Sequence, residues 1–405
     1  MSRIAWYSNA CHIPSGYGMQ TAQVVHQMVR DGHDVAISAN HGASVMMNCA
    51  HGHPILPEGL IRYSLDAAPD NIRGWIEDQP GFGVILFDLW PLNGVQGFKD
   101  LNLACWTPID HEPAPPGVIQ FLKEGNHHAI AMSRFGEKML ANAGISNENI
   151  TYIPHGIDLS IFYDRGKEAR APMGVPEDAF LVVTNAANRG RIPVRKAFGE
   201  MADAMATFMR DRPDVVWMIH TEPQGHSEGV NLPRLVAHLG IDPKRVRYPH
   251  PVQFRNGIPQ DAIAAMYSAA DVQLLTSMGE GFGIPAIESQ ACGTPVIVSD
   301  FTAQPELIGA YGKAVPVQRV WDEFQQSFFG IPNVPAIVTA LQEVYEDTKA
   351  GKVDRAAVSA AMTRYDQVKL YEASWKPLIE MMTARKKQPV GQPNREQRRA
   401  LKRRK

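Results

Sequence analysis

One stretch near residue 280 constrains the fold of this chain more than any other. The apolar run Val272–Leu275 predicts a short, buried parallel strand, and another apolar run follows at residues 296–298. Between them, residues 279–288 read Gly-Glu-Gly-Phe-Gly-Ile-Pro-Ala-Ile-Glu, where Gly281 and Gly283 permit a tight turn and the proline suits the first turn of a helix. The stretch therefore predicts a strand–turn–helix–strand unit, whose free helical N–H groups favour an anion or a hydroxyl-rich ligand.

The length and the apolar content of the chain favour two globular domains. With 405 residues, of which 44% are hydrophobic, the chain can build two complete cores. No run of about 18 apolar residues occurs, so we expect no membrane-spanning helix. The first residues lack the apolar region of a signal peptide, and no Cys-x-x-Cys spacing is present. We therefore expect a cytoplasmic protein whose cysteines are reduced core thiols, with neither a disulfide nor a zinc site: Cys11, Cys49, Cys105 and Cys292.

Two carboxylates accompany the glycine turn. Glu280 is expected on the loop and Glu288 two turns into the helix, so the pair can contact different parts of one elongated ligand. A strand–helix turn with two solvated glutamates is the plain structural alternative. The whole string, however, resembles the E-x7-E signature of retaining nucleotide-sugar glycosyltransferases of family four and their relatives. This resemblance implies that Glu280 and the Gly-Phe-Gly backbone contact sugar hydroxyls and that Glu288 holds the ribose. The donor-binding residues implied on this segment are Gly281, Phe282, Gly283, Ile284 and Glu288.

The first half of the chain alternates predicted strands and helices. A glycine turn with Gly16 and Gly18 connects the first strand to a helix, an arrangement that cradles phosphate groups. A turn that needs positive φ explains a single Gly-x-Gly equally well. In the resembled family, an equivalent loop approaches both the acceptor and the phosphates of the donor. The strands predicted in this half are 3–10, 34–38, 84–87, 103–106, 129–133 and 150–153.

A polar loop, residues 107–113, follows one of these strands. Ligands of α/β sheets bind at the carboxyl ends of parallel strands, so this loop is a candidate part of the active site. Members of the resembled family carry a His or an Asp here, close to the sugar that is transferred. The resemblance therefore implies a catalytic role for Glu280 together with Asp110 or His111, and which of the last two faces the sugar stays open. A charged surface loop is the alternative.

The end of the first domain is indicated by residues 150–158, whose Ile-Pro-His-Gly-Ile-Asp ending resembles the Ile-Pro-x-Gly-x-Asp ending in the family. His155 lies between proline and glycine, which indicates a hinge turn and a structural role. The polar stretch after residue 163, broken by proline and glycine, is the expected linker. We expect an acceptor-side domain at 1–165, a donor domain at 176–350, helices returning to the first domain at 351–386, and a basic disordered tail at 387–405.

Clustered cations characterise the loop that follows the expected strand 180–184. This loop contains Arg189, Arg191, Arg195 and Lys196. Such a cluster is unfavourable unless an anion neutralises it, and guanidinium and ammonium groups both suit phosphate oxygens. Family members carry an Arg and a Lys five positions apart that grip the donor diphosphate, and Arg191 and Lys196 have this spacing. A solvated basic loop is the alternative.

The remainder of the second half continues the α/β alternation. Residues 247–251 resemble the family segment that faces the nucleotide base, but the segment is too degenerate to identify the base. After Val317 we expect helices, at 334–349 and 366–386. In the resembled fold, a terminal helix commonly crosses back onto the first domain.

The resemblance covers about residues 3–385 and implies the α/β GT-B architecture, in which two Rossmann-like, doubly wound domains face each other across a cleft. It implies transfer of a sugar from a UDP- or GDP-sugar to an acceptor hydroxyl of a glycan, lipid, protein or modified DNA, with retained anomeric configuration. Cations and helix N-termini would stabilise the leaving diphosphate, so we expect no required metal or other cofactor. Two alternatives stay open, a nucleotide-sugar epimerase of the same fold and an inactive polyanion-binding scaffold.

The charge of the chain is unevenly distributed. Residues 385–405 contain ten Lys or Arg and one acid, a net charge of +9, so the remaining residues carry −2 − 9 = −11. An acidic body with a basic tail suits docking to a polyanion such as DNA, an anionic membrane surface or an acidic protein. The tail loosely resembles short basic ends of some phage-encoded proteins. A solvated tail without function is the alternative.

Overall fold

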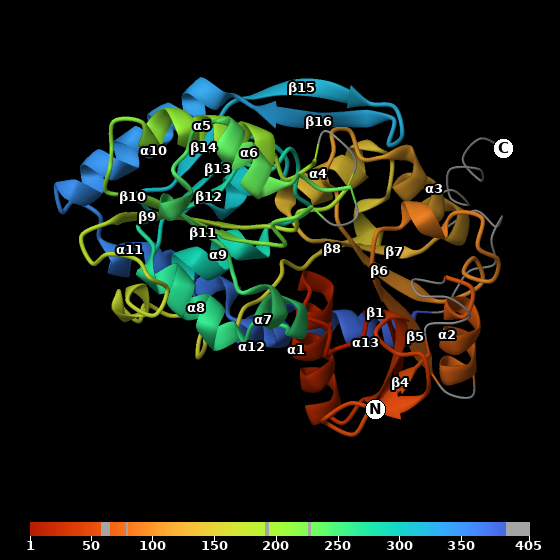
Figure 1. Cartoon of the computed structure of the whole chain (residues 1–405). Coiled ribbons are helices and arrows are strands. Elements are labelled where there is room, and N and C mark those ends of the chain that lie inside the picture. The colour runs from red at the N-terminus through yellow and green to blue at the C-terminus, as the bar shows by residue number, and fades with distance from the viewer. Residues whose placement is uncertain (58–64, 78–79, 191–193, 226–227, 386–405) are drawn as a thin grey trace.

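The computed structural model describes residues 1–57, 65–77, 80–190, 194–225 and 228–385. Within these residues the chain forms two large, mainly parallel sheets and a separate hairpin (Figure 1). This arrangement confirms the predicted α/β class with two Rossmann-like halves. No helix in the described part is both long and apolar enough to cross a bilayer.

The first sheet has the strand order β3-β4-β2-β1-β5-β6-β7-β8, and all its pairs are parallel except β3 with β4. Its strands are β1 (Arg3–Asn9), β2 (Asp34–His41), β3 (Met47–Asn48), β4 (Pro54–Leu56), β5 (Gly81–Leu86), β6 (Leu103–Thr107), β7 (His128–Ala131) and β8 (Ile150–Tyr152). The helices of this half are α1 (Gly16–Arg30), α2 (Ala68–Ile76), α3 (Pro116–Gly125) and α4 (Arg134–Asn142). Both faces of the sheet are covered: Ile4 and Trp6 of β1 join one apolar core, and Ala5 and Tyr7 join another.

The second sheet has the order β11-β10-β9-β12-β13-β14 and is parallel throughout. Its strands are β9 (Phe180–Asn185), β10 (Val215–His220), β11 (Val246–Arg247), β12 (Val272–Leu275), β13 (Val296–Ser299) and β14 (Lys313–Val315). The helices of this half are α5 (Phe198–Met209), α6 (Leu232–His238), α7 (Pro251–Asn256), α8 (Gln260–Ala269), α9 (Ile284–Ala291) and α10 (Val334–Lys349). Alternate residues of β9 again enter two cores, Phe180 and Val182 in one, Leu181 and Val183 in the other.

The segment after Val317 differs from the prediction of helices alone. β15 (Val317–Asp322) and β16 (Ser327–Pro332) form an antiparallel hairpin that reaches from the second half toward the first (Figure 1). Trp321 lies opposite Phe328 with ring centroids 5.1 Å apart, and such aromatic cross-strand pairs stabilise hairpins. Phe328 also forms a backbone bridge with Glu112 of the first half.

The C-terminal segment returns to the first half, as expected. α11 (Arg355–Ala360) still packs on α9 of the second half, whereas α12 (Gln367–Leu370) contacts α1 and α13 (Lys376–Ala384) contacts β5. The single helix predicted at 366–386 is interrupted by a π-helical turn, which is followed by a proline in the first turn of α13. Trp375 packs against Trp6 and Trp106 of the first sheet, with ring centroids 5.5 and 4.9 Å apart. Expulsion of water from these large rings holds the C-terminal segment in place.

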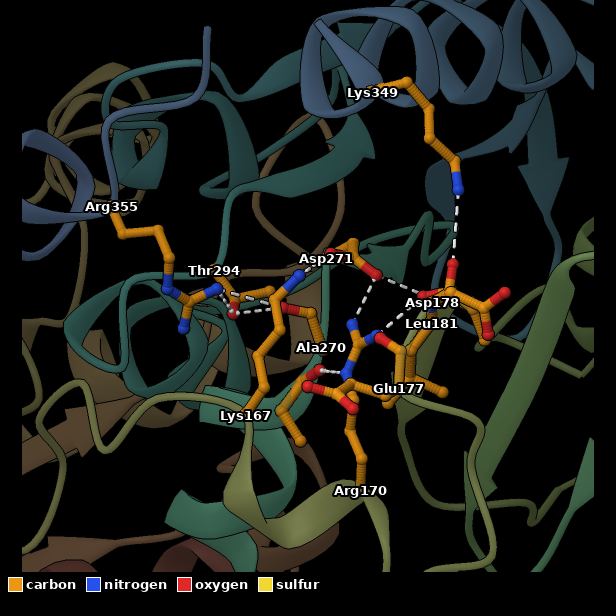
Figure 2. A network of polar contacts seen from close by, with 12 residues as sticks. Lys167, Arg170, Glu177, Asp178, Leu181, Ala270, Asp271, Thr294, Lys349 and Arg355 are labelled. Carbon is orange, nitrogen blue, oxygen red and sulfur yellow. Dashed lines mark hydrogen bonds and ion pairs between the residues drawn. The ribbon is translucent and has the colours of Figure 1, made fainter. Parts of the chain in front are cut away.

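A buried ion-pair network joins the linker to the second half (Figure 2). The Arg170 side chain is 3% exposed and pairs with Asp271, which is also 3% exposed, at 2.7 Å. Lys167 approaches the other oxygen of the same carboxylate at 2.7 Å. Arg170 further donates to three backbone carbonyls, so each of its three side-chain nitrogens is hydrogen-bonded. On the same side, Arg355 forms a bidentate pair with Asp164 at 2.9 Å.

Candidate active site

The glycine turn before α9 lies against the first half of the molecule. A Cβ atom on Gly279 would lie 2.1 Å from the carbonyl oxygen of Asp110, and one on Gly281 would lie 2.2 Å from Pro108. Both glycines are therefore required for close approach of the two loops. Gly283 has φ +114° and precedes α9, so it supplies the turn that the sequence predicted. The turn thus meets the polar loop 107–113 at the junction of the two sheets.

Glu280 is buried on this turn and contacts two cations. Lys196 Nζ binds one carboxylate oxygen, and Arg195 Nη1 lies 3.5 Å from the other. The Glu280 backbone N–H donates to Thr302 Oγ1 at 3.0 Å, which fixes the turn. Burial alone would raise the pKa of the Glu280 carboxyl, but Lys196 and Arg195 outweigh it and hold the pKa below its ordinary value. The carboxylate is therefore charged and ready to accept hydrogen bonds from hydroxyl groups.

Asp110 and His111 belong to the same cluster of charges. His111 Nδ1 lies 2.8 Å from Asp110 Oδ1, and His111 Nε2 lies 3.4 Å from Asp322 Oδ2 on β15. Burial would lower the pKa of His111, but the two carboxylates outweigh it and raise the pKa above its ordinary value. Arg195 approaches Asp110 Oδ2 at 3.5 Å, and together with His111 it holds the pKa of Asp110 well below its usual range against the effect of burial. Arg195 thus joins Asp110 of the first half to Glu280 of the second.

Glu288 occupies a different environment, although it lies on the helix that follows Glu280. It is 4% exposed, and the Tyr267 hydroxyl donates to its Oε2 at 3.2 Å. Asn185 Nδ2 donates to that hydroxyl at 2.7 Å, and Asn185 Oδ1 lies 2.8 Å from His220 Nδ1. Burial raises the pKa of Glu288 to about 7. The carboxyl therefore stands at the edge of ionisation near neutral pH, unlike Glu280.

The first glycine loop also reaches the junction. Ser15 caps α1 by accepting the Gly18 backbone N–H at 3.1 Å, and a Cβ on Gly18 would lie 2.2 Å from the Ile13 carbonyl oxygen. A Cβ on Gly16 would lie 3.6 Å from Ile284 at the start of α9. The beginnings of α1 and α9 therefore come together, one from each half, an arrangement that favours an anionic ligand.

A cavity of about 290 Å³ lies on the second half of the molecule. His220, at the end of β10, and Tyr248, after β11, are among its lining residues. Residues 247–250, which resemble the base-facing segment of the family, all line it. The carboxyl ends of β10 and β11 thus border a hollow, as expected for a ligand site of a doubly wound sheet. The other lining residues are Pro172, Met173, Met218, Gln253, Ile258, Ala262, Ile263 and Met266.

The structure gathers most of the predicted site residues, and it adds others. Arg191 lies outside the described residues, so its position beside the cluster stays a prediction. Arg195 belongs to the predicted cation loop, but the prediction chose Arg191 and Lys196 as the pair that grips the diphosphate. The position of Arg195 next to Lys196 in the sequence is the signal that could have identified it. No sequence motif indicated Tyr17 or Asp88. The Tyr17 hydroxyl donates to Asp88 Oδ2 at 3.3 Å. Burial, together with the nearby charge of Asp110, raises the pKa of Asp88 to about 6.

Comparison with known sequences identifies relatives of the chain. Residues 245–352 match the family model described as glycosyl transferases group 1. The D-inositol 3-phosphate glycosyltransferase of Streptomyces bingchenggensis is 30% identical over 296 residues, which cover 64% of this chain and 62% of that protein. The match therefore spans less than two thirds of the length of the relative.

Solved structures establish the fold. The sucrose-phosphate synthase from Thermosynechococcus elongatus has a TM-score of 0.69 at 18% identity, and the match covers 95% of this chain and 100% of that chain. HepE from Anabaena, in complex with UDP and glucose, has a TM-score of 0.66 at 17% identity, with 95% and 100% covered. Likeness at such low identity shows the fold alone, and it confirms the predicted GT-B architecture. The chain thus combines a GT-B fold with a segment of its second half, residues 245–352, that is similar to the glycosyl transferases group 1.

Proposed function

We propose that the chain transfers a hexosyl group from a nucleoside-diphosphate sugar to an acceptor hydroxyl, with retention of the anomeric configuration. The observation that carries this proposal is the cluster of Lys196, Arg195, Glu280 and Asp110 between the two halves. Two cations and two carboxylates meet there beside the starts of two helices. Such a site offers cations to a diphosphate and charged oxygens to sugar hydroxyls.

Each charged group has a distinct task in this proposal. Lys196 and Arg195 bind the diphosphate and stabilise the negative charge that grows as the bond to the sugar breaks. Glu280, held ionised by the same cations, accepts hydrogen bonds from sugar hydroxyls and orients the ring. Asp110 and His111 contact the sugar from the opposite loop. A phosphate oxygen of the donor accepts the proton of the acceptor hydroxyl, so this step needs no protein base.

Glu288 is assigned to the ribose. Its partner Tyr267 belongs to α8, and residues of α8 line the cavity beside residues 247–250. The cavity is therefore assigned to the nucleotide base. A UDP-sugar is the favoured donor because HepE, which shares the fold, binds UDP, and a GDP-sugar is the second candidate. The proposed chemistry requires no metal, because the two cations and the helix starts face the diphosphate.

Two rival functions make different predictions. An epimerase would convert the donor without an acceptor, and an inactive scaffold would bind without turnover. Purified protein should be tested with a panel of UDP- and GDP-sugars by thermal shift, because a donor that binds the folded state raises Tm by mass action. Donors that bind should then be incubated alone, and release of nucleoside diphosphate measured. Slow release supports a transferase, an altered sugar still attached to the nucleotide supports an epimerase, and neither product supports a scaffold.

The acceptor, the location and the tail belong to the same proposal. Residues 387–405 lie outside the described part of the chain, and their basic charge is proposed to dock the acidic body to a polyanion. DNA with a modified base, an anionic membrane surface and an acidic protein are the candidate surfaces. A cytoplasmic location and a phage origin stay predictions from the sequence.

A further inference from the structure

Two cysteines and a histidine come together at the edge of the first sheet. The ligand atoms of Cys11, Cys49 and His53 all lie within 4.8 Å of one another. Cys49 Sγ lies 3.0 Å from His53 Nδ1. Two sulfur atoms and one imidazole nitrogen form a set of ligands that suits a borderline-soft divalent cation. This cluster takes no part in the donor site described above.

The fold assembles the cluster from two segments that are distant in the sequence. Cys11 follows β1 in the loop that leads to α1, whereas Cys49 and His53 stand at the two ends of the turn between β3 and β4. The Cys49 N–H donates to the His53 carbonyl, and the Gly52 N–H donates to the Cys49 carbonyl, both at 3.0 Å. Gly52 has φ +85°, which suits this tight turn. The backbone thus places both side chains before any ion binds.

A hydrogen bond to sulfur and a pair of histidine rings border the cluster. The His51 N–H donates to Cys49 Sγ at 3.2 Å, and N–H groups of this kind stabilise a thiolate. The His51 ring lies against the His26 ring of α1, with centroids 3.9 Å apart and ring planes inclined by 35°.

We propose that Cys11, Cys49 and His53 bind one Zn²⁺ ion, with water or His51 in the fourth position. Binding replaces the thiol protons of Cys11 and Cys49, which pass to solvent, and the two thiolates and one imidazole donate electron pairs to the ion. The absence of a Cys-x-x-Cys spacing led us to expect no zinc site. That expectation missed this cluster because Cys11 and Cys49 are far apart in the chain.

The proposed ion would support the glycine loop of the first half. Cys11 lies two residues before Ile13, and a Cβ on Gly42 at the end of β2 would lie 2.6 Å from Ile13 Cγ1. The same short loop ends at Ser15, which caps α1 and precedes Gly16. An ion held by Cys11 and by the β3–β4 turn would therefore fix the loop at both the sheet edge and the helix start. Its role is structural and distinct from chemistry at the diphosphate.

The direct test is metal binding by the full-length chain. Protein purified with a reducing agent and without chelator should contain about one zinc per chain. After zinc removal, titration with Co²⁺ should produce thiolate-to-cobalt charge-transfer absorption and tetrahedral d–d bands that saturate at one equivalent. Free zinc at roughly 100 times Kd should raise the Tm of the metal-free protein by roughly 3 °C.

Variants locate the site. Cys11→Ser, Cys49→Ser and His53→Ala should each weaken Co²⁺ binding at least tenfold and reduce the charge-transfer band, whereas Cys292→Ala, which removes a buried cysteine elsewhere, should bind as the wild type does. If a variant fails to fold, the wild-type titration still decides. No zinc in the wild type together with no cobalt band at micromolar concentration overturns the proposal. So does a Cys11–Cys49 disulfide in the reduced preparation, or a band that survives all three substitutions.

Discussion

Replacing Glu288 with glutamine should stabilise the free protein while weakening its grip on the donor. The pKa of the buried Glu288 carboxyl is about 7, against an ordinary value of 4.5. Below pH 4.5 the carboxyl is protonated in both the folded and the unfolded chain, so its ionisation does not affect stability. Between pH 4.5 and 7 the unfolded chain loses this proton first, and the free energy of unfolding falls as pH rises. The difference of about 2.5 pH units, at about 1.4 kcal/mol for each, amounts to about 3 kcal/mol above pH 7.

Glutamine removes this penalty because it carries no charge and keeps an oxygen for the Tyr267 hydroxyl. Glu288→Gln should therefore unfold at a higher urea concentration than the wild type at pH 8.5, and the advantage should vanish near pH 4.5. Donor binding should show the opposite effect. Charge-assisted hydrogen bonds to the ribose contribute roughly 1.5–3 kcal/mol each, so both Glu288→Gln and Glu288→Ala should lower kcat/KM for the donor at least tenfold, mainly through KM.

The assay combines urea unfolding at pH 5, 7 and 8.5 with donor kinetics at pH 8. Glu346→Gln provides the matched control, because Glu346 is exposed on α10 and should leave both measurements unchanged. A stability gain that does not grow with pH would refute the account of Glu288 burial. A stability gain without any change in donor KM would instead refute its assignment to the ribose. The two parts of the reasoning therefore fail separately.

Four further predictions concern the cations, the hairpin, metal ions and the tail. Arg195→Ala and Lys196→Ala should each lower kcat about 100-fold or more. The urea midpoints of unfolding should change little, because Glu280 keeps one cation in either variant. Variants that do not fold would contradict this prediction. Asp322→Asn should lower the pKa of His111, measured by NMR titration, because one carboxylate that raises it is removed; an unchanged pKa would reject the contact. Added Mg²⁺ or Mn²⁺ after brief EDTA treatment should alter initial rates less than about twofold, and a strict requirement for either ion would overturn the proposed cation mechanism. Deleting residues 388–405 should leave donor hydrolysis unchanged and weaken salt-dependent binding to DNA or to anionic vesicles, whereas equal binding with and without the tail would favour a solvated tail.

Local patterns in the sequence determined the fold class and the centre of the site. Buried parallel strands read as continuous apolar runs, so most of the strands could be predicted directly. The turn before α9 was predictable because Gly283 must adopt positive φ and the next proline can only begin a helix. Glu280 and Lys196 were selected through the resemblance to family-four glycosyltransferases, and both lie on loops at the carboxyl ends of parallel strands, where such sheets bind ligands.

Long-range contacts could be decided only by the tertiary structure. The choice of Arg195 as a site residue depends on its contacts. Its guanidinium lies near carboxylate oxygens of Asp110 and Glu280, which are far from it in the sequence. The hairpin after Val317 was missed because its strands pair with each other and dock on the other half, and no helical or buried-strand period marks them. The raised pKa of Glu288 and the contact between Cys11 and Cys49 also depend on the tertiary structure. Burial and proximity are properties of the packed chain, because they depend on residues that the sequence places far apart and that only the folded sheets bring together.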